Sequence, residues 1–146
     1  MQATESVAAR LAAGNLDGVD RLLTFDQIGA WSYVGGLQGI PAEVKSLDGL
    51  NVVMVGYLLP FSVDPVEDLI VESLMQMHAR GAPPTNRMVR VVMTPPPGVH
   101  LFGGPVMVAG KFRVRESITD GYCNDIFQID AWHVEALWDG SRLPNR

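Results

Sequence analysis

Hydrophobic residues form an almost unbroken run from Leu50 to Phe61, which reads LNVVMVGYLLPF. Alternate side chains of a strand point to opposite faces, and both faces of this run are apolar. Such a strand is either central in a layered α/β sheet or the long, bent first strand of a small closed barrel. Gly56 favours the barrel, because a glycine inside a strand is typical of a bend or a close backbone approach. Pro60 lacks an amide donor and predicts the end of regular pairing.

Four further segments read as strands. The alternation is clearest over 106–115, where one face carries Val106, Val108, Gly110, Phe112 and Val114 and the other carries Met107, Ala109, Lys111, Arg113 and Arg115. This pattern predicts one wet, basic face. The other predicted strands are 68–74, 88–93 and 126–134, and in the last of them Phe127, Ile129 and Ala131 oppose Gln128, Asp130 and Trp132.

Three short helices are predicted beside these strands. The first runs from a cap at Thr4 or Ser6 to Ala12, and it should either dock through Val7 and Leu11 or fray. The others are predicted at 24–28 and 41–47, the latter with Pro41 as its first residue. Gly18, between two aspartates, predicts a turn, and 29–39 reads as a loop pinned by burial of Trp31 and Tyr33.

Together these elements predict an all-β fold with short flanking helices, a five-stranded OB-like barrel. The proline-rich segment 94–104 stands where such barrels usually carry a helix between the third and fourth strands. The expected organisation is an N-terminal helical segment at 1–28, an OB-like β-barrel domain at 29–138 and a flexible tail at 139–146.

Composition narrows the classes of function. The chain has 146 residues, 47 % of them hydrophobic, which is enough for one domain to bury a core without a metal or a disulfide. A net charge of −5 has the wrong sign for neutralising nucleic-acid phosphates. Cys123 is the single cysteine, so no intrachain disulfide or Cys-pair metal motif is possible. No apolar run is long enough for a transmembrane helix, and the first fifteen residues lack the apolar region of a signal peptide.

An ordered series of motifs resembles the bacterial DUF3299 family, a domain of unknown function. The series comprises IPAEVKSLDG with VVMVGYLLPFSVD, DLIVESL, GAPPTNRMVRVVM with its Asn86, PVMVAGKFRV and DGYCNDIFQIDAWHVE. The resemblance runs from about Thr24 to Leu137. It implies a compact all-β domain, often exported or lipid-anchored, sometimes encoded beside transporters associated with zinc handling, with no activity to carry over.

The loop after the second strand departs from that family. Many relatives have a cysteine or cysteine pair there, whereas this chain has Met77 and His78 or their neighbours, which argues against a thiolate-based role. Met75, Met77 and His78 are soft ligands that suit Cu(I). The competing interpretation is stronger, because methionine usually fills gaps in cores. We therefore expect no cofactor, with copper or zinc as the weaker alternative.

The basic strand face suggests a second kind of site. Lys111, Arg113 and Arg115, with Tyr57 or Trp132 as stacking platforms, match the way OB barrels bind single-stranded nucleic acid. Three charges are few, however, and the face is equally suited to cross-strand partners such as Asp130.

Catalytic chemistry has little support in the sequence. Cys123, His133 and Asp130 are the one conceivable catalytic set, but strand alternation places Asp130 and His133 on opposite faces. No catalytic residue is therefore assigned.

The sequence thus favours a non-enzymatic binding or accessory module that docks a protein partner or small ligand, and the resemblance implies a bacterial envelope protein linked to a transport system. The alternatives are a single-stranded nucleic-acid binder and a soft-metal carrier that uses the loop from Met75 to His78. The expected location is the periplasm or envelope if a signal segment has been removed, and otherwise the cytoplasm. The oligomeric state stays open.

Overall fold

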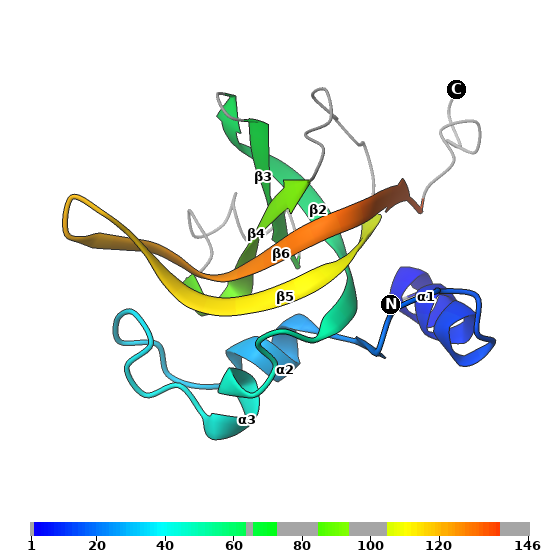
Figure 1. Cartoon of the computed structure of the whole chain (residues 1–146), viewed down its shortest axis with the longest axis horizontal. Helices are drawn as coiled ribbons and strands as arrows, with labels where there is room; N and C mark the ends of the chain where they lie inside the picture. Colours follow the sequence, from blue (N-terminus) through cyan, green and yellow to red (C-terminus); the bar gives the residue numbers. More distant parts are fainter. Residues whose placement is uncertain (1, 64–65, 73–84, 94–104, 138–146) are drawn as a thin grey trace.

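The computed structural model describes residues 2–63, 66–72, 85–93 and 105–137 (Figure 1). Within these ranges the protein is mostly β, with one mixed sheet and a few short helices. The strands are β1 (Arg21–Leu22), β2 (Asn51–Val63), β3 (Val66–Val71), β4 (Met88–Met93), β5 (Val106–Thr119) and β6 (Tyr122–Ala136). The helices are α1 (Gln2–Ala12), α2 (Phe25–Gly29) and α3 (Ala42–Lys45), with a 3-10 turn, η1, at Thr85–Arg87.

The sheet is built around β2, which has two long partners. Its first half pairs antiparallel with β5, from Asn51 opposite Lys111 to Gly56 opposite Val106. Its second half pairs with β3, beginning with Tyr57 opposite Val71. The strand order is β1-β2-β3-β4-β6-β5, with β2 and β5 also paired, so the sequence of pairings that begins at β2 returns to it. The sheet is mixed because β4 pairs parallel with β6 and β1 pairs parallel with β2.

Six strands rather than five make up this sheet. The five predicted strands are all present, and the extra one is β1, two residues that align beside Val52 and Val53. Two residues are too few to show a hydrophobic period, which explains why β1 was not predicted.

Gly56 lies where β2 changes partner, since it is the last residue paired with β5. A Cβ atom at this position would lie 2.5 Å from the carbonyl oxygen of Val71 and 2.9 Å from Cγ1 of Ile70. Both separations are too short for real atoms, so only glycine fits without a shift of the neighbouring backbone.

The prediction for Pro60 was wrong in part. Pairing of β2 with β3 continues beyond Pro60 to Val63, but the register shifts between Pro60 and Ser62. Loss of the proline amide therefore coincides with a bulge and does not end the strand.

The main core is enclosed by the sheet and by α2. It contains Leu23, Phe25, Ile28, Val44, Leu47, Val52, Met54, Ile70, Val89, Val91, Val106, Val108, Phe112, Ile126, Phe127, Ile129 and Ala131. The Phe112 and Phe127 rings stack with centroids 5.4 Å apart. Thr24 caps α2 in a capping box with Gln27, which fixes the start of this helix. The third helix is shorter than predicted at both ends, since Pro41 is its N-cap and Ser46 is its C-cap.

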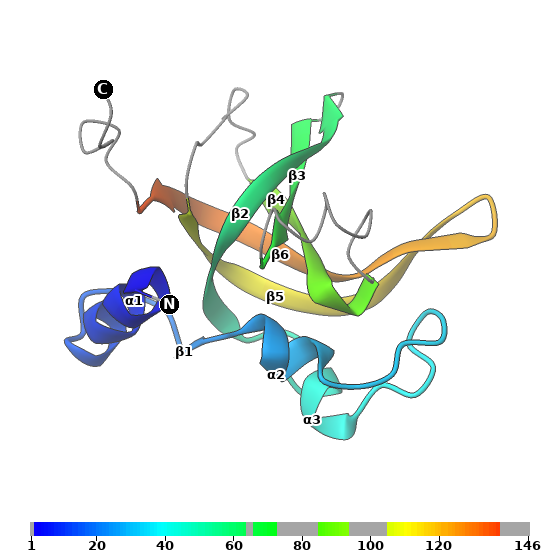
Figure 2. The same cartoon turned by 180° about the vertical axis from the view of Figure 1, so that it is seen from behind.

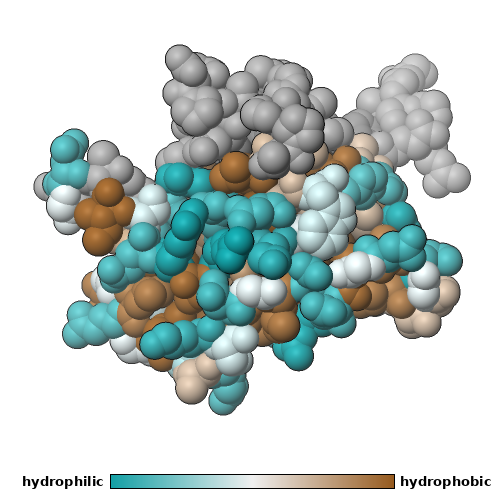
Figure 3. Space-filling view, viewed as in Figure 1, coloured by the Kyte–Doolittle hydropathy of each residue, from teal (hydrophilic) through white to brown (hydrophobic). Residues whose placement is uncertain are grey.

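A second, smaller apolar cluster lies on the outer face of β2 and β5. Its buried members are Val7, Val53, Val55, Met107 and Ala109. Val7 is fully buried, so α1 docks on the sheet (Figure 2). The outer face of β5 is thus apolar and buried at Met107 and Ala109, exposed at Lys111 and Arg115 and partly exposed at Arg113. The predicted wet face is therefore limited to the second half of the strand. Figure 3 shows hydrophilic residues across the middle of the face on which β5 and β6 lie in Figure 1. Within the described ranges, no helix has both the length and the apolar composition needed to cross a bilayer.

Candidate functional site

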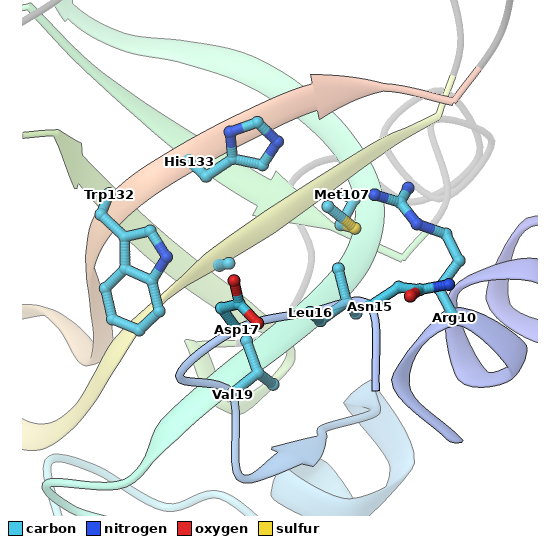
Figure 4. Close-up of a pocket in the computed structure, with 9 residues that line it drawn as sticks. Arg10, Asn15, Leu16, Asp17, Val19, Met107, Trp132 and His133 are labelled. Carbon is cyan, nitrogen blue, oxygen red and sulfur yellow. The ribbon is translucent and has the colours of Figure 1, made fainter. Parts of the chain in front are cut away.

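A pocket of about 250 Å³ opens between the segment after α1 and the outer face of β5 and β6 (Figure 4). We call it the Trp132 pocket. Its lining residues are Arg10, Asn15, Leu16, Asp17, Val19, Met107, Ala109, Trp132 and His133. The pocket combines apolar side chains with several charged or titratable groups, and small-molecule sites use both kinds of contact.

A β-bulge in β6 positions the indole of Trp132. Ala109 of β5 lies opposite His133, but the next residue, Gly110, lies opposite Ala131, so Trp132 is an extra residue with no partner in this ladder. A bulge reorients a side chain and bends its strand. Gly110 allows the close approach, because a Cβ atom there would lie 2.6 Å from Cα of Ala131.

The indole remains accessible although the N-terminal segment contacts it. Trp132 is 46 % exposed, one of the few large hydrophobic side chains at the described surface. A Cβ atom at Gly18 would lie 4.0 Å from Cζ2 of Trp132, so the turn at 17–20 lies against the ring. The turn predicted from Gly18 therefore forms one wall of the pocket.

The bulge also corrects the predicted faces of β6. Asp130 pairs with Lys111 and His133 pairs with Ala109, two positions apart on β5. Side chains two residues apart on a strand share a face, so Asp130 and His133 lie on the same, outer face. The prediction of opposite faces was wrong because strict alternation does not include the extra residue.

A linked set of charges borders the pocket on the β6 side. Nη1 of Arg10 lies 2.8 Å from Oε2 of Glu135, and Nη2 lies 3.3 Å from Oε1. Nε2 of His133 lies 3.0 Å from the same Oε1. The hydrogen bond from Arg10, followed by that from His133, lowers the pKa of Glu135 below its ordinary value.

Asp17, in contrast, retains an unused carboxylate. Among the described residues, no hydrogen bond or ion pair engages it, and its side chain is exposed. In Figure 4 this carboxylate lies near the indole of Trp132. Sequence reasoning identified Trp132 as a candidate but not Asp17 or Arg10, which lie far from β6 in sequence.

A second pocket of similar volume has less to offer a ligand. It is lined by Thr4, Leu22, Leu23, Thr24, Phe25, Asp26, Val55 and Glu72. Both of its carboxylates contact Nη1 of Arg87, Asp26 at 2.8 Å and Glu72 at 3.4 Å. Both carboxylates are therefore already engaged within the protein, although the one positive charge of Arg87 balances only one of them.

The predicted basic face is partly neutralised. Nε of Arg113 donates to Asp130 at 2.8 Å, and Asp130 also accepts from Gln128 at 2.7 Å. Burial would raise the pKa of Asp130, but the hydrogen bonds from Arg113 and Gln128 and the nearby arginine charges outweigh it, so this pKa lies below its ordinary value. Nη2 of Arg115 donates to Gln128 at 3.1 Å, and Lys111 is exposed.

Tyr57 lies apart from these charges. It is six residues along β2 from Asn51, the partner of Lys111, which corresponds to about 20 Å of strand. Val53 and Val55, under α1, occupy the outer face between them. The structure therefore brings Trp132 near Lys111 and Arg113 on the outer face, whereas Tyr57 lies about 20 Å of strand away from Lys111.

The other sequence candidates do not form a site in the described part of the chain. Met75, Met77 and His78 lie outside the described residues, as do the tail 139–146 and the segment 94–104. Across the ranges described, no group of three or more His, Cys, Asp or Glu side chains could hold a metal ion. Cys123 contacts the carbonyl of Asp125 at 3.5 Å and lies about 30 Å of strand from His133.

Comparison with solved structures shows which known protein has a similar fold. No family model matches the sequence, and neither does any curated protein. The structure is similar to the crystal structure of a DUF3299 family protein from Pseudomonas aeruginosa PAO1, with a TM-score of 0.59 and 22 % identity, covering 84 % of this chain and 100 % of that one. The resemblance to DUF3299 predicted from the sequence motifs is thus confirmed, as a shared fold.

Proposed function

We propose that this protein is a non-enzymatic binding module that takes a small ligand in the Trp132 pocket. One observation carries the proposal: a half-exposed indole stands on a bulge, beside a carboxylate that no described residue engages. An exposed indole forgoes the stabilisation that burial of its apolar surface would give. Bulges that reorient a side chain are common beside functional sites. The volume of about 250 Å³ lies just below the range of drug-sized pockets.

The scaffold of this module is an OB-type closed barrel made of β2, β3, β4, β6 and β5. The return of the pairings to β2 supports closure, and the parallel pairing of β4 with β6 supports the OB-type order. In this proposal β1 is an addition to the barrel wall. The Trp132 pocket then lies on the outside of the barrel, under the N-terminal segment.

A binding role is better supported than catalysis or nucleic-acid binding. Cys123 and His133 are ten positions apart on β6, too far for a nucleophile and its base. Asp130 engages Arg113, which leaves only Lys111 and Arg115 on the basic face without an acidic partner among the described residues, and the net charge of −5 disfavours phosphates. Envelope location and a link to transport stay predictions from the resemblance.

The test is a screen of small cationic, neutral and anionic fragments by proton–nitrogen correlation NMR of the tryptophan indoles. The chain has three tryptophans, and Trp132→Phe assigns the relevant signal. We expect at least one class of fragment to shift the Trp132 indole and to lose binding in Trp132→Ala. Ile118→Ala, which removes another exposed apolar side chain outside the pocket, should leave binding intact. If no class shifts the Trp132 indole, the proposed function is wrong.

A further inference from the structure

We infer that the ligand of the Trp132 pocket is a small organic cation whose ammonium group lies against the indole of Trp132 and the carboxylate of Asp17. This inference rests on the proposed function and adds the chemical class of the ligand. It follows from the charges that line the pocket and from which of them are already paired.

Arg10 has little charge left to offer an anion. Two of its guanidinium nitrogens contact the two carboxylate oxygens of Glu135, at 2.8 and 3.3 Å. Such a two-point contact uses both charges and fixes their geometry. Nε2 of His133 contacts the same carboxylate at 3.0 Å. Glu135 therefore already engages both Arg10 and His133, the two basic side chains that line the pocket.

Asp17 is the charge that remains. No described residue pairs with it, and Arg10, Asp17 and Glu135 together carry one more negative than positive charge. The protein as a whole is also negative, with a net charge of −5. A cation entering the pocket gains attraction from Asp17 and from the overall field, whereas an anion meets repulsion from both.

The indole supplies the second contact that an ammonium group needs. The negative face of tryptophan attracts a cation within about 6 Å of the ring centroid, more strongly than tyrosine or phenylalanine does. Trp132 is 46 % exposed, and Gly18 leaves the ring uncovered by any side chain at that position. Leu16, Val19 and Met107 give apolar walls for the alkyl part of the ligand. A carboxylate, an open indole and apolar walls together match an alkylammonium compound.

The experiment compares three probes of nearly the same shape and different charge. Choline carries the cation, dimethylbutanol is its neutral carbon isostere, and dimethylbutyrate is an anion of similar size. Each is titrated into the full chain while the Trp132 indole signal is followed by NMR. We expect choline to bind at least about tenfold more tightly than the other two, since both contacts act on its charge.

Two charge-matched variants test the role of Asp17. Asp17→Asn should weaken choline binding about threefold to tenfold and leave dimethylbutanol unchanged. Asp120→Asn removes the same charge at the turn between β5 and β6, where asparagine also tolerates the positive φ of 52°, and should leave choline binding unchanged. Both positions are exposed, so neither change threatens folding.

The outcomes separate the two proposals. Tighter binding of dimethylbutanol or dimethylbutyrate at Trp132 overturns the cation inference and supports the binding function. Choline binding that is equally weakened by Asp17→Asn and Asp120→Asn reflects net charge alone and also overturns it. Failure of every fragment in the broader screen overturns the binding function itself.

Discussion

Arg10 of α1 forms a two-point ion pair with Glu135 of β6, with Nη1 2.8 Å from Oε2 and Nη2 3.3 Å from Oε1. The two residues are 125 positions apart, so this contact joins the two ends of the described chain. It lies beside the apolar cluster in which Val7 is buried, and the two interactions together hold α1 on the outer face of the sheet. The N-terminal wall of the Trp132 pocket depends on this docking.

Replacing Glu135 with glutamine should lower the free energy of unfolding at pH 7 by about 0.2 to 1 kcal/mol, because both partners are about one-third exposed. The pKa of Glu135 is lowered in the folded protein, so its carboxylate stabilises the fold above the ordinary glutamate pKa of about 4.3. That contribution is lost as the pH falls through the folded-state pKa. Urea denaturation of the wild type and Glu135→Gln should therefore differ at pH 7 and converge below about pH 4.

A double-mutant cycle with Arg10→Met assigns this effect to the ion pair. The coupling energy at pH 7 should account for most of the loss in Glu135→Gln. A coupling energy of zero would mean that α1 is held by Val7 and its apolar neighbours alone.

Gly56→Ala should lower the free energy of unfolding by about 1 to 3 kcal/mol. Even one methyl group would meet the Val71 carbonyl oxygen and Cγ1 of Ile70, so β2 or β3 must move. Gly56→Val should cost more, because its side chain is larger and branched. The measurement is the midpoint of urea unfolding. An unchanged midpoint for both variants would show that the backbone of β2 at Gly56 does not lie in close contact with β3.

Phe112 and its neighbours test the two faces of β5. Phe112→Ala should cost about 3 to 5 kcal/mol, since the ring is fully buried and stacks on Phe127. Lys111→Ala on the exposed face should stay within about 0.5 kcal/mol, and Arg113→Ala within about 1 kcal/mol because it loses the contact with Asp130. Similar losses in all three variants would contradict the assignment of faces.

The strands were predictable where one face is buried. Alternation located 88–93 with its observed bounds and the beginning of β5, since Val106, Val108 and Phe112 are all in the core. It missed the far ends of β5 and β6, where the two strands extend together beyond the core. Ile118 is 59 % exposed there, so no burial imposes a period on the sequence.

The candidate site was predictable only in part, for two physical reasons. Trp132 stood out as an aromatic residue among polar neighbours, but the bulge that orients it depends on pairing with Ala109 and Gly110, which a single strand does not reveal. The remaining walls come from the segment after α1, and contacts across such separations leave no local pattern. The sequence identified Asp17 only as part of a predicted turn and not as a binding residue.

The last prediction concerns Asn86, whose side chain is 3 % exposed. Its Nδ2 donates to the carbonyl oxygens of Gly29, at 3.3 Å, and Trp31, at 2.9 Å, so η1 holds the loop that follows α2. Asn86→Asp keeps the shape but removes both donors and sets a buried carboxylate against two carbonyl oxygens. We expect a loss of about 1 to 3 kcal/mol at pH 7.

Acid should partly restore this variant. Burial raises the pKa of the introduced carboxyl, and its protonated form regains one donor for the carbonyl oxygens. Stability relative to wild type should therefore rise as the pH is lowered from 7 to about 4. Gln38→Glu, which introduces the same charge at an exposed position of that loop, is the control and should show no such recovery. A loss in Asn86→Asp that does not change with pH would mean that the side chain fills space and does not hold the loop through its hydrogen bonds.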